Sequence, residues 1–137
     1  MTTIFENKHW IVEKDGGRPL LVVRRTPWPY TVAAEVELSF RPMEAALYAA
    51  DRRSLVLLLD MRAGPFRNDA EFEDAAHTHP QRFFRGFLRM AVVVRTAAGR
   101  LQAQRYFRQR GVDVMTFIDE LEAIAFLLAP PSSRRRP

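Results

Sequence analysis

Three apolar stretches along the chain have the pattern of strands in a mainly parallel sheet. Residues 55–59 form an unbroken apolar run, which is typical of a strand that is buried on both faces. Residues 90–94 form a second run of this kind, and residues 112–117 alternate like a strand nearer the sheet edge. The pattern therefore predicts a sheet whose centre lies at residues 55–59.

A β-hairpin is predicted before this central strand. Residues 10–14 and 20–24 are apolar segments that flank Asp15-Gly16-Gly17, a strong turn signal. Two prolines in residues 26–30 then predict a connecting loop.

Four helices are predicted from apolar residues at a spacing of three to four. The first is expected to begin at Thr31 and to bury Val32, Val36, Phe40, Met43 and Leu47, with Pro42 as a kink or a break. The second covers residues 70–89, where the apolar positions are Phe72, Ala76, Phe83, Phe87 and Leu88, interrupted by Pro80.

The third and fourth helices carry clear end signals. Thr96 is expected to begin the third, and Gly111 ends it as a C-terminal cap. Asp119 is expected to begin the fourth, which Pro130-Pro131 stops.

These elements predict one α/β domain over residues 1–128, with the order β-β-α-β-α-β-α-β-α and a disordered basic tail at 129–137. The sheet is expected to have four to five strands, mainly parallel, with the hairpin at its N-terminal side. If the strands follow the order of the sequence, right-handed crossovers place their helices on one face. The opposite face then needs a loop, a second subunit or a partner to cover it.

Composition narrows the class of protein. The 137 residues are 47% hydrophobic, which suits a single domain with a real core, and no apolar run is long enough to span a bilayer. Cysteine is absent, which excludes disulfides, thiolate catalysis and cysteine-based zinc sites. We expect a soluble, cytoplasmic protein.

The positive charge does not favour nucleic-acid binding. The net charge is +5, but Arg134, Arg135 and Arg136 lie in the tail, so the folded part carries 5 − 3 = +2. Four arginines of the third predicted helix form no tight stripe, so a solvated surface is favoured. They are Arg100, Arg105, Arg108 and Arg110.

Polar residues gather after the central strand, where the carboxyl ends of parallel strands place ligand-binding loops. The candidate binding residues are Asp60, Arg62, Arg67, Asn68, Asp69, Arg95 and Thr96. They could hold an anion or phosphate through guanidinium groups and helix N–H groups. Helix capping and surface ion pairs are commoner roles for such residues and are favoured.

No pattern for catalysis, a metal or a cofactor is visible. His77 and His79 would point about 200° apart on a helix, and His9 stands alone, so none indicates a metal site. Phe83, Phe84 and Phe87 could line a groove for an apolar ligand, but core packing is the commoner role.

The chain resembles the STAS-like, SpoIIAA-like superfamily, the fold of anti-sigma-factor antagonists and, more distantly, of lipid-binding CRAL-TRIO domains. The resemblance spans residues 10–128. It rests on the hairpin followed by a helix, on SLVLLLDMR, and on MAVVVRT leading through a helix to VDVMTFIDELEAIAFL. It implies a mainly parallel sheet and an interaction role.

One feature of the antagonists is missing. Their phosphorylatable serine lies at the start of the helix after the central strand, whereas residues 60–69 contain neither Ser nor Thr. A phosphoserine switch adds nearly two negative charges at a helix end. This site is therefore not expected to be phosphorylated.

The sequence favours a non-enzymatic regulatory or scaffold module that binds a protein partner or a second copy of itself. Docking through the loop at residues 62–69 is expected, with an apolar patch buried on association. The alternative is a binder of a small amphipathic or lipid-like ligand, held in a pocket between helices and sheet.

Overall fold

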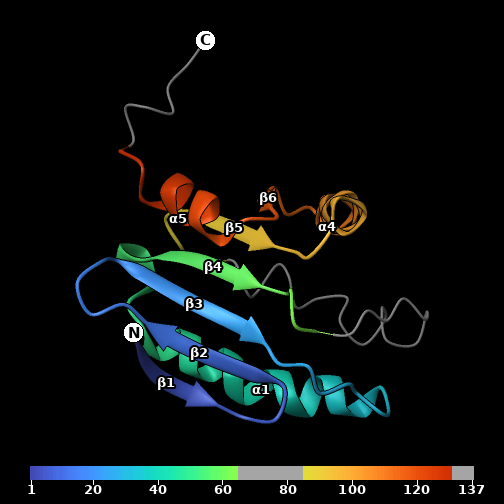
Figure 1. Cartoon of the computed structure of the whole chain (residues 1–137). Helices are drawn as coiled ribbons and strands as arrows, with labels where there is room; N and C mark the ends of the chain where they lie inside the picture. Colours follow the sequence, from blue (N-terminus) through green and yellow to red (C-terminus); the bar gives the residue numbers. More distant parts are fainter. Residues whose placement is uncertain (65–84, 131–137) are drawn as a thin grey trace.

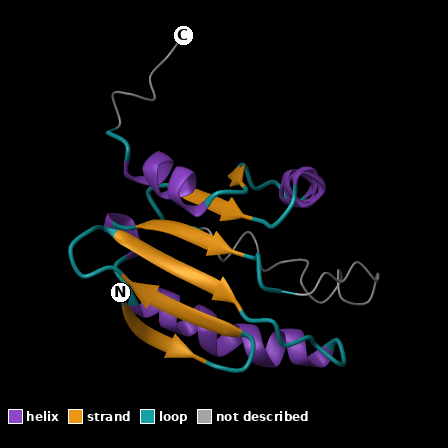
Figure 2. Cartoon of the chain, viewed as in Figure 1, coloured by secondary structure: helices purple, strands orange, loops and turns teal. Residues whose placement is uncertain are grey.

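The computed structural model describes residues 1–64 and 85–130, which form one six-stranded sheet with helices on both faces (Figures 1 and 2). The strands are β1 (Thr2–Glu6), β2 (Trp10–Lys14), β3 (Leu20–Arg25), β4 (Val56–Asp60), β5 (Met90–Val93) and β6 (Met115–Phe117). The helices are α1 (Ala34–Ala49), α4 (Ala97–Gln109), α5 (Glu120–Leu128) and the short 3-10 helix η1 (Arg52–Ser54).

The strands lie side by side in the order of the sequence. The pairs β1–β2 and β2–β3 are antiparallel, and the pairs β3–β4, β4–β5 and β5–β6 are parallel. Consequently β3, β4 and β5 all end at the same edge of the sheet, which we call the carboxyl edge; their arrowheads point to it in Figure 1.

The protein has two separate hydrophobic cores, one on each face of the sheet, because successive side chains of a strand point to opposite faces. On the face covered by α1 and α4, Leu57 and Leu59 of β4 pack with Phe40 of α1 and Phe107 of α4. On the face covered by α5, Leu58 of β4 packs with a second set of buried residues. These are Leu20, Val22, Val56, Ala91, Val93, Ala123 and Leu127. Both faces of β4 are buried, as its unbroken apolar run predicted.

The sheet has six strands, whereas four to five were expected from the sequence. Residues Thr2–Glu6 form β1, which pairs with β2 through a register shift between Thr3 and Phe5. The segment was missed because it is short, largely exposed and interrupted by this irregularity.

The face expected to lie uncovered is covered by α5. The crossover helices α1 and α4 do share one face, as right-handed connections require. Because α5 follows the last strand, it joins no two strands and is free to pack on the opposite face, where it contacts β4, β5 and β6. The expectation of an uncovered face was wrong for this part of the sheet.

The start of α1 differs from the prediction. The helix begins at Ala34, and Val32 is 56% exposed rather than part of the core. Thr31 does not accept a capping bond; instead the Glu35 carboxylate accepts hydrogen bonds from the backbone N–H groups of Thr31 and Val32. Pro42 lies inside α1, which continues past it without a break.

The helix predicted at residues 70–89 is only partly testable, because its residues 70–84 lie outside the described part of the chain. Residues 85–89 are not helical: Gly86 has a φ of 91°, and the chain turns there. Phe87 is buried against the α1 face, while Leu88 is 61% exposed. This end of the prediction was wrong because a left-handed glycine stops any helix.

The later end signals are confirmed. The Thr96 hydroxyl accepts from the Gly99 N–H, and the Asp119 carboxylate accepts from the Leu121 N–H, so each caps its helix. Gly111 follows α4 with a φ of 74°. None of the described helices is long and apolar enough to cross a membrane.

Candidate functional site

Charged side chains lie at the carboxyl edge of the sheet, on the face that α5 covers. On β3 the row that faces α5 runs Leu20, Val22 and then Arg24, and on β4 it runs Val56, Leu58 and then Asp60. Each strand therefore places its first charged residue on this face where the sheet ends. We call the group Glu13, Arg24, Asp60, Arg62 and Glu120 the ion-pair network.

Arg24 is the centre of this network and touches three carboxylates. Its guanidinium lies 2.9 Å from Glu13 on β2, 2.6 Å from Asp60 on β4 and 2.8 Å from Glu120 at the start of α5. Arg62 donates to both oxygens of Asp60, at 2.9 and 3.0 Å, and also to Glu120. The network therefore ties three strands to α5.

The pKa shifts of Asp60, Glu120 and the two arginines of the network favour the charged forms. Burial alone would raise the pKa of Asp60, but hydrogen bonds from Arg62 and Arg24 hold it below its ordinary value. The hydrogen bond from Arg24 likewise lowers the pKa of Glu120, and the same bond raises the pKa of Arg24. These carboxylates are thus ionised at neutral pH and engaged by arginines, which suits them to holding elements together rather than to proton transfer.

The predicted binding residues fall into different places. Asp60 and Arg62 belong to the ion-pair network. Arg95 donates to the carbonyl oxygen of Arg62 at 3.1 Å, and Thr96 caps α4. Arg67, Asn68 and Asp69 lie outside the described residues, as do His77, His79, Phe83 and Phe84. Binding of a ligand or partner by the predicted set stays a prediction.

A second arginine, Arg25, lies next to Arg24 but on the α1 face. It is 5% exposed and forms no ion pair within residues 1–64 and 85–130. Its Nη1 donates to the carbonyl oxygen of Thr26 at 2.7 Å, and its guanidinium carbon lies 4.6 Å from the ring centre of Tyr30 and 5.6 Å from that of Trp10. Carbonyl oxygens and aromatic faces thus take the place of an acid.

His9 and Tyr30 complete this second group. Their rings stack at 4.2 Å between centres, and the Trp10 indole N–H donates to the Tyr30 hydroxyl at 3.0 Å. His9 is 4% exposed, and its Nε2 has no hydrogen-bond partner among the described residues. We call His9, Trp10, Arg25 and Tyr30 the aromatic–arginine group.

Burial controls the pKa values in this group. It lowers the pKa of His9, and the neighbouring Arg25 lowers it further. Burial also lowers the pKa of Arg25, although an arginine stays charged at neutral pH. His9 is therefore held as a neutral ring beside a buried cation.

The backbone of Gly64 lies directly against the stem of Arg25. A β-carbon built at Gly64 would come within 2.5 Å of the Arg25 Cγ. The loop that follows β4 can therefore lie this close to β3 only because residue 64 has no side chain.

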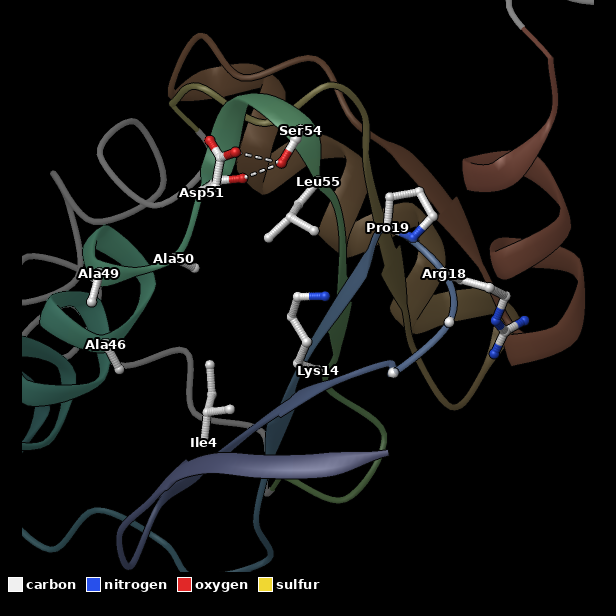
Figure 3. A pocket seen from close by; sticks show the side chains of 12 residues that line it. Ile4, Lys14, Arg18, Pro19, Ala46, Ala49, Ala50, Asp51, Ser54 and Leu55 are labelled. Atoms are coloured by element: carbon white, nitrogen blue, oxygen red, sulfur yellow. Dashed lines mark hydrogen bonds between the residues drawn. The ribbon is translucent and has the colours of Figure 1, made fainter.

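An open hollow of about 650 Å³ lies at the opposite edge of the sheet, beside the last turn of α1 (Figure 3). It is lined by Ile4, Lys14, Gly16, Gly17, Arg18, Pro19, Ala46, Ala49, Ala50, Asp51, Ser54 and Leu55. Within the described residues, no group of three or more His, Asp or Glu side chains could hold a metal ion.

Several of these residues escaped the sequence interpretation. Arg24 and Glu120 were not singled out, although the alternation of β3 places Arg24 and Arg25 on opposite faces of the sheet. His9 was weighed as a metal ligand and a surface or capping role was favoured, whereas its side chain is buried. A pocket between helices and sheet was considered, but its location was not predicted, because its lining comes from three separate segments of the chain.

The comparisons with known proteins identify the fold. No family model matches the chain, and no curated protein matches it. A solved structure does: an uncharacterised protein of the DUF3478 family with a SpoIIAA-like fold, from Shewanella loihica PV-4. The two structures superpose with a TM-score of 0.62 at 14% sequence identity, over 90% of this chain and 98% of the other. The SpoIIAA-like fold inferred from the sequence is therefore confirmed, whereas the relation to CRAL-TRIO domains stays a prediction.

Proposed function

Starting from the SpoIIAA-like fold, we propose that this protein is a non-enzymatic regulatory or scaffold module that acts by protein–protein interaction, and that its partner is a second copy of the chain. The observation that carries the proposal is an apolar surface where β6 leads into α5. Met115, Ile118 and Leu121 are 47%, 42% and 76% exposed there, within seven consecutive residues. We call these three residues the β6–α5 corner.

The position of β6 supports association through this corner. Its inner side pairs with β5, and within the described residues no strand pairs with its outer side. An outer strand offers unpaired backbone N–H and C=O groups, and proteins usually protect such an edge with charged side chains or proline. Here Met115 of the three-residue strand β6 and Ile118, which directly follows the strand, are apolar instead.

Two copies of one strand edge complement each other. A twofold axis brings each edge opposite its own copy, so that the same backbone groups and the same apolar side chains meet from both sides. Pairing of β6 with β6 would continue the sheet across the dimer and bury the β6–α5 corner of both subunits.

The test is the mass of the assembly for the intact protein and two variants. Native mass spectrometry and sedimentation should show a dimer for the wild type and a monomer for Leu121→Asp, because the substitution places two carboxylates in the shared interface. Leu101→Asp is the matched control: Leu101 lies on α4 and is 64% exposed, so this variant should remain dimeric. A monomeric wild type, or loss of the dimer in Leu101→Asp alone, contradicts the proposal.

A second candidate function is the binding of a small amphipathic ligand. It is favoured by the hollow beside α1, which lies between a helix and the sheet and combines apolar with charged lining residues. Extra mass in the native mass spectrum of the purified protein that disappears on denaturation would support this candidate. Its failure would leave the dimer experiment unaffected.

A further inference from the structure

The hollow exists because the sheet extends further than the helix that covers it. On β2 the side chains facing α1 are Trp10, Val12 and then Lys14, of which the first two are buried against the helix. Helix α1 ends at Ala49, and its last turn brings only the short side chains of Ala46 and Ala49 to the hollow at the end of this row. The sheet therefore presents Lys14 where a further apolar core residue would otherwise lie.

The walls of the hollow are apolar and short. Ala46 and Ala49 of α1 and the following Ala50 form one side. Ile4 approaches from β1, and Leu55 from the position just before β4. Alanine side chains end at Cβ, so they leave the space open. Figure 3 shows the side chain of Lys14 between those of Ile4 and Leu55.

The charged groups around the hollow differ in how far they are engaged. Arg18 is paired with Asp15 at 2.8 Å, and Asp51 accepts the hydroxyl of Ser54 at 2.8 Å. Lys14 donates to the backbone carbonyl of Asp15 at 3.2 Å and forms no ion pair in the part of the chain that the structure describes. Lys14 therefore has two of its three N–H donors left for a ligand.

We propose that the hollow binds a small amphipathic anion, whose carboxylate or phosphate oxygen pairs with Lys14 while its apolar chain lies against the alanines of α1. The proposal rests on the second candidate function above and assigns its ligand class. A volume of about 650 Å³ suits a ligand of this size, since ligand pockets span roughly 300–1,000 Å³. The cation and the apolar wall lie on different sides of one space, so a ligand needs both a charge and a chain to use both.

The experiment compares three ligands that share one chain and differ in charge. Octanoate, octyl phosphate and octylammonium are titrated into the full-length protein at constant ionic strength, and backbone amide shifts are followed by NMR. We expect saturable shifts at residues 14–18 and 46–51 with octanoate or octyl phosphate. Whichever of octanoate and octyl phosphate binds more tightly shows whether the site prefers a carboxylate or a phosphate.

Two lysine variants isolate the contribution of charge. The chain has only two lysines, Lys8 and Lys14, and Lys8 lies outside the hollow with its Nζ 5.2 Å from the ring centre of Trp28. Lys14→Met should weaken octanoate binding about tenfold, because a hydrogen bond to a charged group is lost, and Lys8→Met should leave it unchanged. Ala49→Phe, an exposed position on α1, should block all binding by filling the space.

Each remaining outcome contradicts the proposal in its own way. If no octyl compound binds, both the inference and the second candidate function fail. If all three bind equally, or if Lys14→Met binds octanoate like the wild type, the hollow is a ligand site without an anion anchor. Tighter binding of octylammonium would assign recognition to Asp51 and overturn the inference.

Discussion

Arg24 and Arg25 are consecutive residues at the end of β3, and the protein accommodates their positive charges in two different ways. Arg24 faces α5 and lies among three carboxylates. Arg25 faces α1 and lies among aromatic rings and backbone carbonyl oxygens. The same residue type, one position apart, therefore belongs to an ion-pair network on one face and to an aromatic–arginine group on the other.

The difference determines what is left behind when each arginine loses its charge. The ion-pair network joins Glu13, Asp60 and Glu120, which come from two strands and a helix, so removing Arg24 leaves carboxylates that lack part of their pairing. The aromatic–arginine group contains no acid among the described residues, so removing the charge of Arg25 leaves nothing ionised behind. Loss of the charge should therefore destabilise the fold much more at Arg24 than at Arg25.

The largest effect is expected for Arg24→Met. It should lower the free energy of unfolding by about 3 kcal/mol, because Asp60 is 7% exposed and breaking a buried pair leaves a charge without full compensation. Arg25→Met should cost only about 1 kcal/mol, the size of a cation–π contact. Urea unfolding followed by tryptophan fluorescence measures both.

A surface pair provides the control for this comparison. Arg18→Met removes an ion pair with Asp15 whose arginine side chain is 48% exposed, and it should leave the free energy of unfolding nearly unchanged because water screens the pair. If Arg25→Met were as damaging as Arg24→Met, the distinction between acid pairing and aromatic packing would fail.

An intermediate effect is expected for Gly64→Ala. The new β-carbon would meet the Arg25 Cγ at 2.5 Å, so the loop after β4 has to shift, at a cost of about 2 kcal/mol. Arg25→Ala removes that Cγ, and the double variant should therefore lose less stability than the sum of the two single variants. Additive losses would show that the loop does not depend on this contact. Gly16→Ala, where an added β-carbon meets nothing within 4 Å, is the control.

The smallest effect is a pH dependence that comes from His9. The folded pKa of His9 lies below the ordinary value of 6.5, because burial and Arg25 disfavour its charged form more than a hydrogen bond to the Pro29 backbone and the charge of Glu35 favour it. Between these two pKa values the unfolded chain binds the extra proton, so stability falls as the pH drops below about 6.5 and levels off beneath the folded pKa.

Comparison with His9→Phe isolates this contribution, since phenylalanine keeps an aromatic ring against Tyr30 and cannot titrate. The difference in unfolding free energy between wild type and variant should shift against the wild type as the pH falls from about 7.5 to about 5.5. The other two histidines are present in both proteins and cancel in this difference. A difference that does not change with pH would mean that His9 has the same pKa in the folded and the unfolded chain, and would contradict the lowered pKa.

Much of the fold could be predicted because its signals are local. The apolar run of β4 predicts burial on both faces, and Thr96, Gly111 and Asp119 predict helix ends from a few neighbouring residues. The strand β1 could not be predicted in the same way, since its exposed residues gain their place from pairing with β2.

The candidate sites show the same limit. Asp60 and Arg62 were found because they follow a recognisable strand. Their partners Arg24 and Glu120 lie 36 and 60 residues from Asp60 (60 − 24 and 120 − 60), a separation that no local pattern reports. The hollow beside α1 depends on where a helix ends relative to a sheet, which is a property of packing rather than of any one segment.

The position of α5 has a consequence for the order in which the protein can fold during synthesis. Arg24 and its partner Glu120 are separated by 96 residues, and the buried residues Ala123 and Leu127 come later still. The α1 side of the hairpin and of β4 can be covered while the chain is still growing. On the other side, the apolar row of β3 and β4 stays in contact with water until residues 120–128 have emerged. A pause in translation between β4 and α5 would therefore prolong the exposure of half the core, and this is the interval in which the nascent protein is most open to a chaperone or to aggregation.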